Sequence, residues 1–261
     1  MSQTRRLALL PGAAFALVAL VHLGAHLGGQ ETLAGWSQWL LMPLLALTLA
    51  AATRPHGTRP PAGRSRRPRL VRLTLVALVA SWLGDTAPDL ASEGAGFLVM
   101  VGFFLVAQVV LVAAFWPYRD RSVLALGSRS ARAHRRWFVV PYLVALLALV
   151  VACAPGADAL LVPVVVYGLA LVTMAVLSTG VNTLVWAGGA IFLVSDSLIA
   201  LDAFADGYDL PRHGFWVMLT YIAAQVLVAA GVYRETSSAE VGRAISPLSR
   251  RFRRPLRAQR L

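Results

Sequence analysis

The sequence predicts an all-α fold, a polytopic membrane helical bundle of about eight transmembrane helices, and three observations support this. The chain is 58% hydrophobic and only 14% charged, whereas a soluble domain carries roughly 25% charged residues. Its mean hydropathy is +0.68. Apolar stretches of about 20 residues, the length of helix that crosses the hydrocarbon core of a bilayer, recur along the chain. We therefore expect most of the chain to lie within a membrane.

The apolar stretches place the helices, and the loops between them are too short for a soluble domain. We expect helices at Leu7–Leu27, Trp36–Ala52, Leu70–Leu90, Gly96–Trp116, Trp137–Ala154, Leu160–Thr179, Asn182–Ala203 and Phe215–Tyr233. The longest loops are Thr53–Arg69 and Pro117–Arg136. Any chemistry must then come from the helices and their short connections.

The first apolar run is predicted to be a retained helix. Arg5 and Arg6 precede it, as basic residues precede the apolar core of a secretory signal peptide. The run continues to Leu27, however, which is longer than the roughly 7–15 residues of a signal-peptide core. We therefore divide the chain into a transmembrane domain, residues 1–233, and a basic cytoplasmic tail, residues 234–261, which we expect to be partly disordered.

The basic residues predict the orientation. All 24 are arginine, and the net charge is +12. Eight crossings with both ends in the cytoplasm place every arginine except Arg212 on the cytoplasmic side, as the positive-inside rule requires. The predicted location is the inner (plasma) membrane, where these arginines meet anionic lipid headgroups. Since no aromatic residues alternate with the arginines and no nucleic-acid motif occurs, we expect no nucleic-acid partner.

The chain also contains a possible parallel internal repeat of four helices. The segment Ala107–Ala114 matches Ala224–Ala230 with one gap, and Gln108 aligns with Gln225. An aspartate lies in the helix before each segment. Four helices per half preserve direction, so the halves would be related by an axis along the membrane normal. The alternative is that apolar sequence of low complexity aligns by chance.

Two acidic residues, Asp85 and Asp196, lie well inside predicted helices, away from the helix ends. A charged side chain within a bilayer is costly, and it usually faces a polar interior where it serves function. At 1.5 Å per residue, Asp85 lies about 20 Å beyond Arg72, and Asp196 about 21 Å beyond Asn182. The two acids are therefore predicted to share one depth. Asp89, Glu93 and Asp202 fall farther out, where we expect exposed positions.

Other polar residues reach similar levels in the same helices. They either bind a substrate or only form hydrogen bonds between helices, which is their common role in membrane bundles. The candidates are Gln108, Tyr167, Asn182, Ser195, Tyr221 and Gln225.

Several kinds of active site have no support in the sequence. No phosphate-binding loop, nucleophile elbow or CxxC pair occurs, and Cys153 is the single cysteine. His22 and His26 share a helix face, but the glutamate of an HExxH motif is missing. They fit either the membrane interface or a supporting role near the aspartates. We expect neither a metal ion nor another cofactor.

The segment from Gly189 to Ala200, which contains the Ser195-Asp196 pair, resembles a Ser-Asp motif of the YhhN family. Gly84-Asp85, Pro163 to Tyr167, Met174, and Tyr221 with Gln225 support the resemblance, which covers most of residues 36–233. The chain departs from the family pattern in two places. Gln108 stands where a histidine is expected, and Thr86 follows Gly84-Asp85 in place of a leucine-type residue.

The resemblance implies a lysoplasmalogenase, an enzyme that hydrolyses the vinyl ether bond of a lysophospholipid to a fatty aldehyde and a glycerophospho-alcohol. Asp196 and Asp85 would be the catalytic pair, as two carboxylates are in glycosidases. Tyr221, Gln225 and Ser195 would orient water or the glycerol, and Arg212 would meet the headgroup phosphate. Two alternatives remain: a small proton-coupled transporter that uses the same aspartates, and a non-enzymatic membrane protein.

Overall fold

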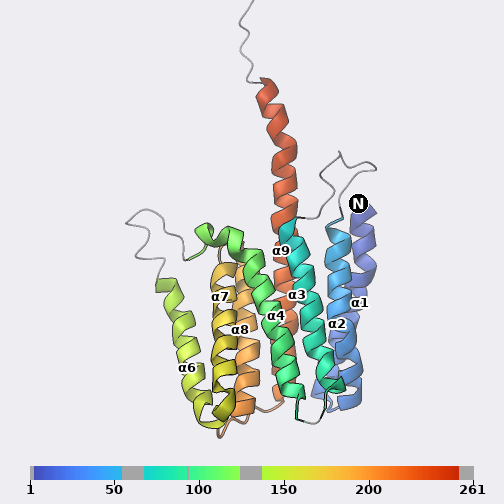
Figure 1. Ribbon diagram of the computed structural model, residues 1–261. Coiled ribbons are helices and arrows are strands. Elements are labelled where there is room, and N and C mark those ends of the chain that lie inside the picture. The colour runs from blue at the N-terminus through green and yellow to red at the C-terminus, as the bar shows by residue number, and fades with distance from the viewer. Residues whose placement is uncertain (1–2, 55–67, 93, 124–136, 253–261) are drawn as a thin grey trace, which may run out of the picture.

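The computed structural model describes residues 3–54, 68–92, 94–123 and 137–252, and this part of the chain is helical, without a strand. Each of its α-helices has at least 18 residues. Figure 1 shows them as one bundle: α1 (Gln3–Leu27), α2 (Glu31–Ala52), α3 (Arg69–Thr86), α4 (Gly96–Phe115), α6 (Val140–Ala157), α7 (Leu161–Ser178), α8 (Thr183–Phe204) and α9 (His213–Phe252). The predicted all-α fold is confirmed.

Short 3-10 helices extend several of the α-helices: η1 (Ala87–Leu90), η2 (Trp116–Arg121), η3 (Trp137–Val139) and η4 (Asp158–Leu160). The predicted third helix, Leu70–Leu90, is therefore α3 followed by η1. The α-helix is replaced by the 3-10 helix after Thr86, because Pro88 has no backbone N–H to continue the α-helical hydrogen bonds.

The last helix is longer than predicted. It continues past Tyr233 to Phe252 and extends well beyond the rest of the bundle (Figure 1). The residues directly after Tyr233 contain no helix breaker, since the first glycine is Gly242 and the first proline is Pro247. Polarity ends a membrane crossing but does not by itself end a helix. Whether residues 234–261 behave as a separate tail stays a prediction, and residues 253–261 lie outside the described part.

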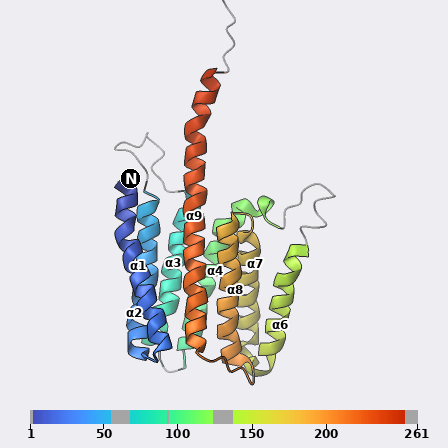
Figure 2. The ribbon, with the colours of Figure 1, turned by 180° about the vertical axis from the view of Figure 1, so that it is seen from behind.

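Seven stretches of the described chain are long and apolar enough to cross a membrane, which supports a multi-pass membrane protein. One of them, Trp137–Ser178, has 42 residues and contains both α6 and α7. Figures 1 and 2 show α6 and α7 side by side and joined at one end of the bundle. The number of eight crossings, the orientation and the internal repeat remain predictions.

Helix α9 occupies the middle of the bundle. It contacts α1, α2, α3 and α8, while α4 bridges α3 and α7. Figure 2, the view from behind, shows α9 between the α1–α2 pair on one side and α8 with α7 on the other, with α6 at the outer edge. A side chain on α9 can therefore reach helices from both halves of the chain.

Adjacent glycines let α8 approach both neighbours closely. A Cβ atom on Gly188 would lie 2.8 Å from Val228 Cγ2 and 2.9 Å from the Ala224 carbonyl oxygen of α9. A Cβ on Gly189 would lie 2.6 Å from Ser178 Oγ of α7. Small residues commonly allow such close packing in membranes. This packing fixes the position of Asp196, two turns farther along α8.

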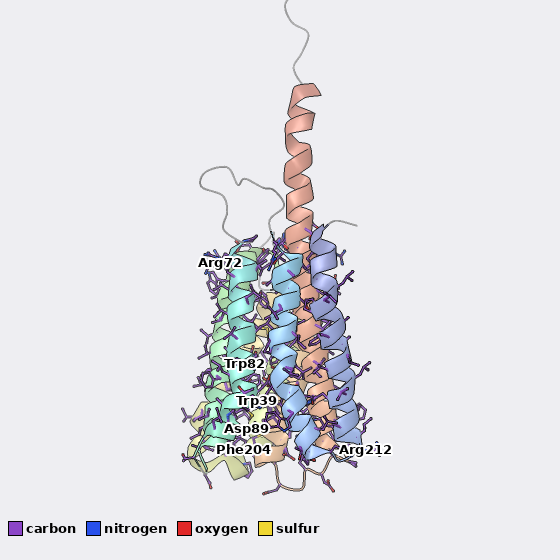
Figure 3. The ribbon with its side chains drawn as sticks, turned by 90° about the vertical axis from the view of Figure 1, so that its right-hand side faces the viewer. Trp39, Arg72, Trp82, Asp89, Phe204 and Arg212 are labelled. Atoms are coloured by element: carbon purple, nitrogen blue, oxygen red, sulfur yellow. The ribbon has the colours of Figure 1, made fainter. Side chains whose placement is uncertain are left out.

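The two ends of the bundle differ. The N-terminal end of α1 and the far end of α9 lie on the same side (Figure 1). Arg72 lies toward that side and Arg212 at the opposite end (Figure 3). Arg121 binds the Gly180 and Val181 carbonyl oxygens and forms an ion pair with Glu235 at 2.8 Å. Most arginines of the predicted loops, at positions 55–67 and 124–136, lie outside the described residues.

Candidate functional site

The two aspartates lie in the interior of the bundle, Asp85 in the last turn of α3 and Asp196 in the second half of α8. Their exposed fractions are 9% and 7%. In Figure 3, Trp82, three residues before Asp85, lies about halfway along the bundle, and Asp89, four residues after it, lies nearer the end away from Arg72. Burial of a carboxyl group is costly unless it has hydrogen-bonding partners.

A tyrosine from a neighbouring helix supplies such a partner for each aspartate. The Tyr221 hydroxyl of α9 donates a hydrogen bond to Asp85 Oδ2, with an O–O distance of 2.8 Å. The Tyr167 hydroxyl of α7 donates to Asp196 Oδ2. The structure therefore brings four of the predicted site residues together as two tyrosine–aspartate pairs, each joining two helices.

Aromatic rings connect the two pairs. The Tyr221 ring meets the rings of Phe104 and Phe192 edge to face, with centroid distances of 5.7 and 5.8 Å. Phe192 lies one turn before Asp196, and Phe104 lines the same pocket as Asp196. Two acids that are far apart in the sequence therefore belong to one interior site.

Asp196 and Tyr167 face an apolar pocket between α4, α6, α7 and α8. The other lining residues are Phe97, Leu98, Met100, Val101, Phe104, Leu149, Leu160, Pro163, Val164, Gly168, Leu171, Ile199, Ala200 and Phe204. The pocket includes Phe204, which lies at the end of the bundle away from Arg72 (Figure 3). Its lining is mostly apolar, and Asp85 is not part of it.

The glutamines lie beside these pairs with different partners. Gln225 Nε2 donates to Ser81 Oγ at 3.1 Å, and Ser81 lies one turn before Asp85 on α3. Gln108 is completely buried, yet neither its side-chain nitrogen nor its oxygen forms a hydrogen bond. Sequence reasoning missed Ser81 and also Gln38, whose Nε2 lies 3.5 Å from the Asp85 carbonyl oxygen. A polar residue inside an apolar helix was the signal available for both.

Three predicted substrate-binding residues are not brought to the aspartates. The buried Ser195 hydroxyl donates to the Val217 carbonyl of α9 at 3.1 Å. Asn182 caps the opposite end of α8, where Oδ1 accepts from Leu184 and Val185 backbone N–H groups. Arg212 is exposed in the connection between α8 and α9 (Figure 3). Asn182 also joins α8 to α9, because its Nδ2 donates to the Gly231 carbonyl oxygen at 2.8 Å.

The outer acids and the histidines lie apart from the tyrosine–aspartate pairs. As predicted, Asp89 and Asp202 are exposed, while Glu93 lies outside the described residues. His22 is fully buried against α2, where Nδ1 lies 2.9 Å from Ser37 Oγ, so its side chain faces a neighbouring helix. Within the described ranges, no three His, Cys, Asp or Glu side chains are grouped so that they could hold a metal ion.

Comparisons with known proteins identify the family. No curated protein and no solved structure matches the chain. The model of the YhhN family matches residues 36–232, which include both aspartates, both tyrosines and the pocket. This match confirms the resemblance carried by the segment from Gly189 to Ala200 and covers most of the chain. The protein therefore belongs to the YhhN family.

Proposed function

We propose that this protein is a hydrolase of the inner (plasma) membrane that cleaves the vinyl ether bond of a lysoplasmalogen. The products are a fatty aldehyde and a glycerophospho-alcohol. Membership of the YhhN family, whose characterised members are lysoplasmalogenases, supports this reaction. The observation that carries the proposal is the pair of buried aspartates, one of which opens onto an apolar pocket.

The chemistry requires one acid and one carboxylate. A carboxyl group protonates the alkenyl carbon next to the alkyl chain, which leaves an oxocarbenium ion on the carbon bonded to oxygen. The second, ionised carboxylate stabilises this cation, as in glycosidases. Water adds to the cation and loses a proton, which restores the acid. The resulting hemiacetal then collapses to the aldehyde and the alcohol, so the net reaction consumes one water molecule.

The site provides groups for each part of this reaction. Asp196 and Asp85 are the two carboxyl groups, and Tyr167 and Tyr221 hold one oxygen of each in place. The alkyl chain occupies the apolar pocket, with its vinyl ether end at Asp196. Because Arg212 and Phe204 both lie at the end of the bundle away from Arg72 (Figure 3), Arg212 remains our candidate for the headgroup phosphate.

The test is aldehyde release from a lysoplasmalogen by the purified protein in detergent. We expect turnover by the wild type and a loss of at least about a hundredfold in Asp196→Asn and in Asp85→Asn, because general acid–base groups contribute about 10²–10⁴-fold. Asp202→Asn is the matched control, since Asp202 is an exposed aspartate of the same helix as Asp196. Full turnover by both site variants would exclude the carboxylate mechanism.

A proton-coupled transporter is the second candidate, because buried acids in a helical bundle also serve proton transfer. Proteoliposomes distinguish the two functions. Transport of a lysophospholipid across the bilayer without aldehyde formation would favour the transporter, whereas aldehyde formation that requires both aspartates supports the hydrolase.

A further inference from the structure

Gln108 is the one buried amide beside the two acids with no partner for either polar atom in the part of the chain that the structure describes. Its exposed fraction is 0%. A buried amide without hydrogen bonds costs free energy, so natural proteins rarely keep one without a reason. Apolar residues of similar size are common throughout α4, and leucine would fill the same space at less cost.

Gln225 has a hydrogen-bonding partner on a neighbouring helix, and Gln108 has no equivalent partner. Gln225 donates to Ser81, the residue one turn before Asp85. The residue one turn before Asp196 is Phe192, which has no polar side-chain atom and packs against the Tyr221 ring. The glutamine of α9 therefore joins two helices, whereas neither polar atom of the glutamine of α4 forms a hydrogen bond within the described residues.

The position of Gln108 on α4 brings its amide close to the Tyr167–Asp196 pair. Phe104, one turn earlier on the same face of α4, lines the pocket with Asp196 and contacts Tyr221. The Gln108 amide lies near the Tyr167 hydroxyl, which is bound to Asp196. Gln108 is not part of the pocket lining, so a small ligand held by its amide would lie beside the Tyr167 hydroxyl that binds Asp196.

We propose that the Gln108 side chain binds the water molecule that attacks the oxocarbenium ion. Water fits because it donates to Oε1 or accepts from Nε2, and a buried water needs two to four polar partners, which the neighbouring carboxyl and hydroxyl groups supply. In the step, one water O–H hydrogen-bonds to Gln108 Oε1 and the other proton passes to a carboxylate. The water oxygen forms the new bond to carbon. This inference rests on the proposed function.

The test compares Gln108→Leu with Gln108→His in the aldehyde-release assay. We expect Gln108→Leu to lower kcat by about tenfold or more, the effect of losing one hydrogen bond of about 1.5 kcal/mol, with KM changed by less than about twofold. Gln108→His should keep a higher kcat than Gln108→Leu, because imidazole retains polar nitrogen atoms. Val109→Ala, on the exposed face of the same helix, is the control.

The readouts separate water binding from other roles. A melting temperature of Gln108→Leu equal to or above that of the wild type, together with the fall in kcat, supports the proposal. A rise in KM at unchanged kcat would instead assign Gln108 to lipid binding and overturn the proposal. A lower melting temperature of Gln108→Leu, or an equal loss of kcat in Gln108→Leu and Gln108→His, would also overturn it. Wild-type kcat in Gln108→Leu overturns this inference alone, whereas an inactive wild type removes the proposed function.

Discussion

At the scale of single residues, each buried acid depends on one tyrosine from another helix. The hydrogen bonds from Tyr221 to Asp85 and from Tyr167 to Asp196 satisfy carboxyl oxygens that water cannot easily reach. Hydrogen bonds to charged groups contribute about 1.5–3 kcal/mol, more than bonds between neutral groups. Removal of a tyrosine hydroxyl should therefore disturb the acid without removing the ring that packs the site.

We expect Tyr221→Phe and Tyr167→Phe each to lower aldehyde release by about ten- to hundredfold, which corresponds to a hydrogen bond of about 1.5–3 kcal/mol. The measurement is kcat/KM on a lysoplasmalogen in detergent. Tyr142→Phe is the control, because the Tyr142 hydroxyl accepts a hydrogen bond from Trp186 away from the aspartates. Equal activity of all three variants would mean that the tyrosines do not position the acids.

The sequence predicted the members of the site better than their contacts. Asp85, Asp196, Tyr167, Tyr221 and Gln225 could be selected because polar residues are costly in apolar helices. Which side chains meet depends on how each helix rotates about its axis, and that rotation is set by packing against several neighbours. Ser195 shows this clearly, because it adjoins Asp196 in the chain but points to the α9 backbone.

At the scale of elements, the contact between α8 and α9 depends on Gly188. Any side chain there meets Val228 and the Ala224 carbonyl oxygen, so the helices must separate. Gly188→Ala should lower the free energy of unfolding by about 1–3 kcal/mol, the usual cost of overpacking a core, and should lower activity by moving Asp196. The measurement is thermal unfolding in detergent with the aldehyde assay.

The control for this prediction is Gly102→Ala. A Cβ atom on Gly102 meets nothing within 4 Å, and alanine is the better helix former. We expect a melting temperature equal to or above that of the wild type. If Gly188→Ala behaved in the same way, the close approach of α8 and α9 would not be required for stability.

Helix positions were predictable because each apolar run must cover the thickness of the hydrocarbon core. The ends were less predictable, since they depend on local features. Pro88 converts the end of the third helix to η1, and α9 continues into polar sequence because nothing between Tyr233 and Gly242 breaks it.

At the scale of the whole molecule, the arginines make the two ends of the bundle unlike. Arg212 lies at the end away from Arg72 (Figure 3). Arg234 belongs to α9, whose far end lies on the same side as the start of α1 (Figure 1). Their side chains are both exposed. The positive-inside rule then assigns Arg212 to the outer face of the membrane and Arg234 to the cytoplasmic face.

Labelling tests this orientation. We expect a membrane-impermeant thiol reagent to modify Arg212→Cys but not Arg234→Cys in intact spheroplasts, and the reverse in inverted vesicles. The native Cys153 is fully buried, so the unmodified protein serves as the unlabelled control. Labelling of both cysteines from one side would show that the two connections share a face and that the number of crossings between them is even.

The central place of α9 also affects how the protein is made. Asp85 is synthesised long before Tyr221, and ribosomes deliver helices to the membrane in chain order, so this acid enters the bilayer without its hydrogen-bond donor. The site therefore forms late, because Asp85 lacks the hydrogen bond from Tyr221 until α9 inserts between the early helices and α8. Shortened nascent chains that lack α9 should be exposed to quality-control proteases during this interval.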